Sequence, residues 1–133
     1  MTDAVLVDTN IILDVTGADP HWLDWSRDQM CQYQGRLWIN PLIYAELCYQ
    51  AETIDAVDSI VAMLGLQYVD LPKEALFWAA KSFQLYRQRG GTKSAPLADF
   101  FIGAHAQVVG CHLLTRDPSR YRSYFPHVPL ICP

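Results

Sequence analysis

The 133-residue chain lacks the features of several specialised classes of protein. It has no run of the roughly 18 or more consecutive apolar residues that a membrane-spanning helix needs. Its start, MTDAVLVD, has no basic segment followed by an apolar one, as a secretory signal would. No stretch is low in complexity and no internal repeat is visible. We therefore expect a compact cytoplasmic protein without a membrane association, folded as one domain over residues 1–133.

Cysteine and histidine are scarce and scattered. The four cysteines contain no C-x-x-C pair, and the four histidines share no spacing typical of metal ligands. Neither a disulfide framework nor a zinc site is indicated. We expect reduced thiols, most of them packed inside the fold.

Charge is low and unevenly distributed. Charged residues make up 18% of the chain and the net charge is -4, which argues weakly against indiscriminate binding to nucleic acid. Residues 1–80 hold 3 Lys/Arg and 12 Asp/Glu, whereas residues 81–133 hold 7 and 2. A polyanion could therefore meet one basic face formed by the second part of the chain.

Short apolar runs alternate with segments of helical periodicity along the chain. We expect strands at 4–8, 36–39, 67–69, 112–115 and 129–132. We expect helices from 10, at 20–33, 41–50, 53–64, 73–89 and 97–109, and after 118. This alternation is typical of an α/β protein whose central parallel sheet is covered by helices on both faces.

Four acidic residues occupy positions from which they could meet. Asp8 and Asp117 each follow a predicted strand, and the carboxyl ends of parallel strands open onto one crevice. Glu46 and Asp99 lie in predicted helices within apolar sequence, which would bury them unless a partner were present. Taken singly, each acid could instead cap a helix, form an ion pair or interact with a helix dipole, so the prediction depends on all four occurring together.

A cluster of carboxylates predicts a hard divalent cation. Acids held close together repel one another and lose hydration, and a bound Mg²⁺ or Mn²⁺ ion would offset both costs. Oxygen ligands suit these ions, which can activate water and stabilise the charge that develops on a phosphodiester. The pattern therefore favours hydrolysis of phosphodiester bonds.

Four segments, taken in order, resemble the successive motifs of PIN-domain ribonucleases, and most closely those of the VapC toxins: VLVDTNIILD, NPLIYAEL, LADFFIGAHA and LLTRDPSRYRSYFP. The resemblance implies a three-layer α/β/α fold, cleavage of RNA with Mg²⁺ or Mn²⁺, and neutralisation by a VapB-like antitoxin. It also implies a homodimer. The acidic quartet of the family falls on Asp8, Glu46, Asp99 and Asp117.

The resemblance also extends to small polar residues beside the acids, which could orient carboxylates or bound water: Thr9, Asn10 and Thr115. Four basic residues near the third and fourth acids are candidates for binding RNA phosphate: Lys93, Arg116, Arg120 and Arg122. Lys93 belongs to a glycine-rich segment that resembles a flexible loop of the family. An equally good interpretation of the three arginines is that they are solvated or pair with the acidic first half.

Other functions remain open at this point. Phosphatases of the haloacid-dehalogenase type also begin with a strand that ends in an acid, but their second acid corresponds here to Asn10. A catalytically silent domain that binds RNA or a protein is another alternative. DNA is a further possible substrate, because phosphodiester chemistry alone does not distinguish the two sugars.

Overall fold

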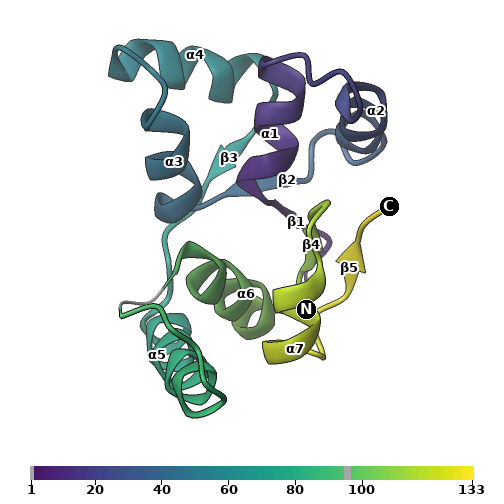
Figure 1. The fold of residues 1–133 in the computed structure, drawn as a ribbon. Coiled ribbons are helices and arrows are strands. Elements are labelled where there is room, and N and C mark those ends of the chain that lie inside the picture. Colours follow the sequence, from purple (N-terminus) through teal and green to yellow (C-terminus); the bar gives the residue numbers. More distant parts are fainter. Residues whose placement is uncertain (1, 95–96) are drawn as a thin grey trace.

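A parallel sheet forms the centre of the molecule. In the computed structural model, which describes residues 2–94 and 97–133, five short strands pair in the order β3-β2-β1-β4-β5 (Figure 1). They are β1 (Val5–Val7), β2 (Leu37–Ile39), β3 (Gln67–Tyr68), β4 (His112–Leu114) and β5 (Leu130–Ile131). Every neighbouring pair is parallel. The predicted parallel sheet is therefore confirmed, although its strands are shorter than expected.

Helices cover both faces of this sheet. They are α1 (Thr9–Thr16), α2 (Leu23–Gln32), α3 (Pro41–Cys48), α4 (Ile54–Met63), α5 (Lys73–Gln88), α6 (Ala98–Val109) and α7 (Ser119–Tyr124). Figure 1 shows α1 to α4 on one side of the strands and α5 to α7 on the other, which confirms the three-layer α/β/α fold. No helix within the described part of the chain is long and apolar enough to cross a membrane.

The two central strands end together. Val7 of β1 lies opposite Leu114 of β4, and both side chains are fully buried. The next residue, Asp8, donates its backbone N–H to the Leu114 carbonyl at 2.9 Å. The chain therefore leaves β1 and β4 at the same edge of the sheet, where the crevice of an open parallel sheet is expected.

Local sequence signals correctly predicted the start of α3 and the end of α6. Asn40 caps α3 by accepting the backbone N–H groups of Leu42 and Ile43, and Pro41 occupies the first turn. Gly110 ends α6 in the left-handed conformation, with φ of 72°. These two ends fix the extent of the helices that carry Glu46 and Asp99.

One helix starts later than its sequence predicts. The Asp19-Pro20 pair indicated a helix from residue 20, but α2 begins at Leu23. The Asp19 carboxylate accepts the backbone N–H groups of His21 and Trp22 at 2.8 and 2.9 Å, and so closes a turn before the helix. This local hydrogen bonding competes with the first turn of α2 and delays it.

The helix predicted at 73–89 is confirmed as α5, and small residues are buried on it. Ala75 and Ala79 are fully buried, whereas the larger apolar residues Leu76, Phe77 and Leu85 are exposed.

The prediction that most thiols are packed inside was too broad, because only one of the four cysteines is buried and Cys31 is exposed.

Candidate active site

The four predicted acids lie together around one open pocket beyond the ends of β1 and β4. The pocket has a volume of about 230 Å³ and is lined by Asp8, Thr9, Asn10, Leu13, Glu46, Asp99 and Asp117. Asp8 and Asp117 come from the chain after the two central strands, Glu46 from α3 and Asp99 from the first turn of α6. Parts of the chain that are far apart in sequence therefore contribute one carboxylate each.

Asp8 is the fixed member of the group. Its side chain is buried, with 6% exposed, and its Oδ1 accepts the Thr9 backbone N–H at 2.8 Å. Its Oδ2 accepts hydroxyl protons from Thr115 at 2.8 Å and from Tyr121 at 2.9 Å. Desolvation raises the pKa of Asp8 to about 6, although these hydrogen bonds favour the charged form and oppose the rise.

The other three acids are more accessible than Asp8. Glu46 and Asp117 are exposed, and the Asp99 side chain is 41% exposed. In α3, Ile43 and Leu47 are buried in the core, whereas Glu46 lies on an adjoining, exposed side of the helix. The expectation that apolar neighbours would bury the two helical acids was therefore wrong for Glu46, whereas Asp99 is partly buried.

Each of these helical acids already has a partner. Glu46 Oε1 accepts the Thr9 hydroxyl proton at 2.6 Å. Asp99 Oδ2 lies 3.9 Å from Arg120 Nη1, and desolvation raises the pKa of Asp99 while Arg120 opposes that rise. Each contact uses one carboxylate oxygen, so that Thr9 orients Glu46 and Arg120 lies beside Asp99.

Tyr121 joins two of the acids, and sequence reasoning missed it. Its side chain is 1% exposed, and its hydroxyl lies 2.9 Å from Asp8 Oδ2 and 3.4 Å from Asp99 Oδ1. Desolvation, followed by the two nearby carboxylates, raises the pKa of Tyr121 well above its usual value. The spacing was a signal for its burial, because Tyr121 in α7 and Phe125 at the C-cap of α7 are four residues apart and therefore share one side of the helix, which is buried.

The three small polar residues connect the chain segments that carry the acids. Besides holding Asp8, Thr115 Oγ1 accepts the Asp117 backbone N–H at 3.1 Å. Asn10 Nδ2 lies 3.4 Å from Thr115 Oγ1 and 3.5 Å from Asp8 Oδ2, while Asn10 Oδ1 accepts the Arg116 backbone N–H at 3.4 Å. The network therefore ties the start of α1 to the chain after β4.

The four basic candidates differ in their positions. The guanidinium group of Arg120 lies over the Tyr86 and Phe100 rings, 5.4 and 5.5 Å from their centroids, beside Asp99. None of the four basic candidates is among the residues that line the acidic pocket. Lys93 and Arg122 are exposed, and Arg122 donates to the Cys132 sulfur at 3.4 Å. The predicted loop around Lys93 extends to residues 95–96, which lie outside the described residues.

Arg116 has a protein partner. Its Nε donates to Asp14 Oδ2 at 2.8 Å and lies 3.1 Å from Asp14 Oδ1. Asp14 is only 2% exposed and also accepts the Ser26 hydroxyl proton at 2.7 Å. This ion pair links the loop after β4 to α1, and the hydrogen bond from Ser26 extends the link to α2. Neither Asp14 nor Ser26 was singled out from the sequence.

The donor set of the acidic pocket suits a hard divalent cation. It contains only oxygen ligands, and the desolvation of Asp8 and Asp99 is a cost that a cation would offset. Within residues 2–94 and 97–133, however, no three acidic, histidine or cysteine side chains are already spaced to hold one ion. The carboxylates fit such an ion by chemistry, but in this structure they do not converge on one point.

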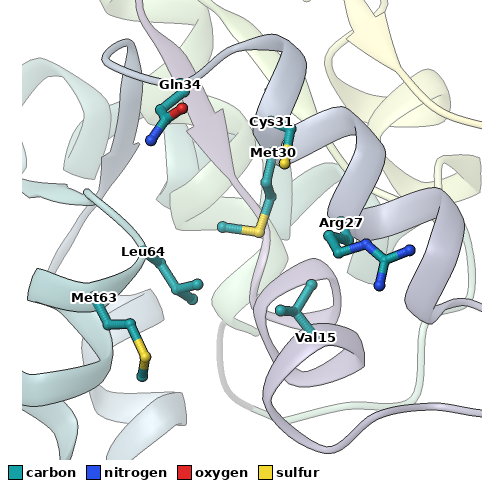
Figure 2. Close-up of a pocket in the computed structure, with 7 residues that line it drawn as sticks. All are labelled: Val15, Arg27, Met30, Cys31, Gln34, Met63 and Leu64. Carbon is teal, nitrogen blue, oxygen red and sulfur yellow. The ribbon is translucent and has the colours of Figure 1, made fainter.

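A separate hollow of about 160 Å³ lies between α1, α2 and the end of α4. Figure 2 shows its lining residues: Val15, Arg27, Met30, Cys31, Gln34, Met63 and Leu64. Its walls are mainly apolar and bring no carboxylates together. The acidic pocket is therefore the better candidate for chemistry.

Comparison with known proteins agrees with this geometry. Residues 5–125 match the PIN domain family. The fold is similar to that of a DNA-bound VapBC complex from Salmonella typhimurium, with a TM-score of 0.73, 18% identity and coverage of 98% of both chains. It is also similar to VapBC2 from Rickettsia felis bound to a promoter DNA fragment, with a TM-score of 0.71, 17% identity, and coverage of 97% of this chain and 98% of that one.

A third similar structure is FitAcB from Neisseria gonorrhoeae, with a TM-score of 0.68, 17% identity and coverage of 96% of both chains. No curated protein sequence gives a significant match. At these identities the structural similarities establish the fold alone. The family match spans nearly the whole chain, and this chain belongs to the PIN-domain family.

Proposed function

We propose that this protein is a metal-dependent endoribonuclease and the toxin of a VapBC-type toxin-antitoxin pair. The observation that carries the proposal is the pocket in which four separate chain segments each contribute one carboxylate. Membership of the PIN-domain family and the fold shared with VapBC complexes support it. With RNA as the substrate, the site of action is the cytoplasm.

In the proposed site, the Asp8 carboxylate keeps one orientation, whereas the carboxylates of the other three acids can change theirs. Asp8 would hold Mg²⁺ or Mn²⁺ through Oδ1, because Oδ2 already accepts two hydroxyl protons. Glu46, Asp99 and Asp117 would complete the oxygen donors from the exposed side of the pocket. When bound, the cation would supply Lewis-acid stabilisation of the charge that develops on a phosphodiester.

The residues around the acids would orient the substrate and the carboxylates. Thr115 and Tyr121 keep Asp8 in one orientation. Arg120, stacked on two aromatic rings at the pocket, is placed to contact RNA phosphate once Asp99 turns toward the cation. The exposed Lys93 and Arg122 are proposed as more distant phosphate contacts.

The direct test is cleavage of a mixed pool of structured RNAs by antitoxin-free protein, with Mg²⁺, Mn²⁺ or EDTA. An Asp8→Asn variant purified in the same way controls for contaminating ribonuclease, and single-stranded DNA of similar length tests the choice of sugar. We expect metal-dependent cleavage of RNA by the wild type alone. Equal cleavage by both proteins, or none with any metal, would contradict the proposal.

Two alternatives have less support. A haloacid-dehalogenase-type phosphatase would need an acid in place of Asn10, whereas Asn10 here donates toward Asp8 and Thr115 as part of the polar network. A silent binding domain would have no use for four intact acids around one pocket. RNA binding without cleavage, in the presence of Mn²⁺, would favour the silent domain.

A protein partner is part of the proposal. The similar structures come from VapBC complexes, and we propose a VapB-like antitoxin for this chain as well. The exposed aromatic residues Phe77 and Trp78 on α5 offer apolar surface for a partner or for a homodimer. Light scattering of the isolated protein would separate a monomer, which contradicts the homodimer, from a dimer.

A further inference from the structure

The loop after β4 is anchored to α1 at two levels. Close to the sheet, the Arg116 backbone N–H donates to Asn10 Oδ1 at 3.4 Å. Farther along α1, the Arg116 side chain donates through Nε to both oxygens of Asp14, at 2.8 and 3.1 Å. Arg116 is therefore held by its backbone and by its side chain to the same helix.

The acceptor of this ion pair is built into the protein interior. Asp14 is 2% exposed, and the Ser26 hydroxyl, itself fully buried, fixes its Oδ2 from α2. The Trp22 ring lies against the guanidinium group, 5.6 Å from Arg116 Cζ to the ring centroid. A buried carboxylate with two donors has one favourable orientation, and so it also fixes the guanidinium group.

The residue next to Arg116 is the acid that has no side-chain anchor. The Asp117 backbone N–H donates to Thr115 Oγ1 at 3.1 Å, but among the described residues no hydrogen bond reaches the Asp117 carboxylate. The place of this carboxylate in the pocket is therefore set by the backbone of the loop. Arg116 and Thr115 are the adjoining residues that hold that backbone.

We propose that the ion pair between the buried Asp14 and the partly exposed Arg116 is a positioning device that fixes the Asp117 carboxylate at the acidic pocket. Arg116 then acts through Asp14 and not as a contact for RNA phosphate. The inference rests on the proposed nuclease function for its catalytic consequence. Its structural consequence, a fixed loop at Asp117, is independent of that function.

The activity test uses variants that keep size and shape. Asp14→Asn removes the charge of the acceptor, and Arg116→Lys keeps the positive charge but loses the guanidinium geometry. We expect each to lower kcat by about 10- to 100-fold with little change in KM for RNA, because displacement of a ligand acid affects the reacting geometry. The double variant should lose no more than either single variant, since both break one interaction.

The control is an exposed ion pair of the same kind. Arg27 Nη2 lies 2.9 Å from Asp24 Oδ1 on the surface of α2, and Arg27→Lys should leave kcat and KM unchanged. A contact to RNA phosphate predicts a different result: Arg116→Lys would raise KM and reduce its dependence on salt, while Asp14→Asn would have no effect on kcat. That outcome would overturn the proposal.

A second readout does not depend on cleavage. We expect the backbone amide of Asp117 to exchange its hydrogen faster in Asp14→Asn and Arg116→Lys than in the wild type or in Arg27→Lys. If the wild type neither cuts RNA nor binds Mn²⁺, the proposed function fails, and the exchange rate still tests the ion pair. Unchanged exchange at Asp117 in both variants would overturn it.

Stability limits the choice of variants, since removing one partner of a buried pair leaves the other uncompensated. Ser26→Ala is therefore the third variant, because it removes one hydrogen bond to Asp14 and keeps both charges. It should raise the exchange rate of the Asp117 amide, but by less than Asp14→Asn and Arg116→Lys do. An exchange rate in Ser26→Ala equal to that of the wild type would count against the ion pair as the positioning device.

Discussion

The burial of Asp8 predicts how the metal-free protein responds to pH. The folded-state pKa of Asp8 is about 6, against 3.8 for an unperturbed aspartate. Between these two values the folded state binds more protons than the unfolded state does, and so stability falls as the pH rises through this range. In EDTA, Asp8 should therefore contribute more to stability near the lower value than at neutral pH.

The size of this effect follows from the shift. A rise of roughly two pKa units corresponds to about 3 kcal/mol of free energy of unfolding, which is fully present below the unfolded-state pKa and is lost once the pH exceeds about 6. Asp8→Asn removes the titrating group and should remove this loss. Its absolute stability also changes, because the amide replaces one acceptor of hydroxyl protons with a donor, so the pH slope is the quantity to compare.

The assay is urea denaturation of wild type and Asp8→Asn in EDTA, at steps from about pH 4 to about pH 7, with the difference between the two proteins plotted against pH. The titration of His105 has the opposite effect on stability. Desolvation lowers the pKa of His105, so the fold loses stability as the pH falls below the unfolded-state pKa of this residue. His105 is common to both proteins, and its contribution cancels in the difference. Parallel curves for the two proteins would refute the assignment of a raised pKa to Asp8.

Three further predictions concern single residues. Asp99→Asn in metal-free buffer should raise the melting temperature or leave it unchanged. Added Mn²⁺ should then stabilise the wild type more than the variant. Lower metal-free stability of the variant, with equal responses of both proteins to Mn²⁺, would contradict a shared metal site. Asn40→Ala should lower the free energy of unfolding, measured by urea denaturation, by about 1–3 kcal/mol, because it removes the cap of α3 and the hydrogen-bond partner 3.1 Å from His105 Nδ1. A free energy of unfolding equal to that of the wild type within error would contradict this role. Gly103→Ala should cost about 1–3 kcal/mol in the same assay, since its Cβ would lie 2.3 Å from Phe125 Cδ2, and wild-type stability would show that the Phe125 ring moves aside without cost.

The sequence was sufficient to predict the sheet and the acids because both depend on local patterns. Asp8 and Asp117 follow apolar strands, and β1 and β4 are neighbours, so their carboxyl ends had to open onto the same crevice. The pair Asn40-Pro41 predicted where α3 begins, and this start determines the position of Glu46 along the helix. In these cases a short segment of sequence decides the position of the side chain.

Partners that depend on distant packing could not be predicted in the same way. Asp14 has an apolar sequence neighbourhood that gives no sign of a partner, and its contact with Arg116 joins residues 102 positions apart. Tyr121 reaches Asp8 across 113 positions because α7, which carries it, packs against α6. Periodicity predicted the helix α5, but it could not predict that Ala75 and Ala79 are fully buried while larger apolar residues of the same helix are exposed.

The unequal burial of the four acids has a physical reason. A carboxylate held in a dry site loses hydration, and for Asp8 this cost is offset by hydrogen bonds from Thr9, Asn10, Thr115 and Tyr121. Four carboxylates buried to the same extent would repel one another with little screening, which would destabilise the fold in the absence of a cation. The exposure of Glu46 and Asp117 reduces that repulsion, because solvent screens their charges. This difference in burial is consistent with a pocket that four acids share while no three of the described acidic, histidine or cysteine side chains are already spaced to hold an ion.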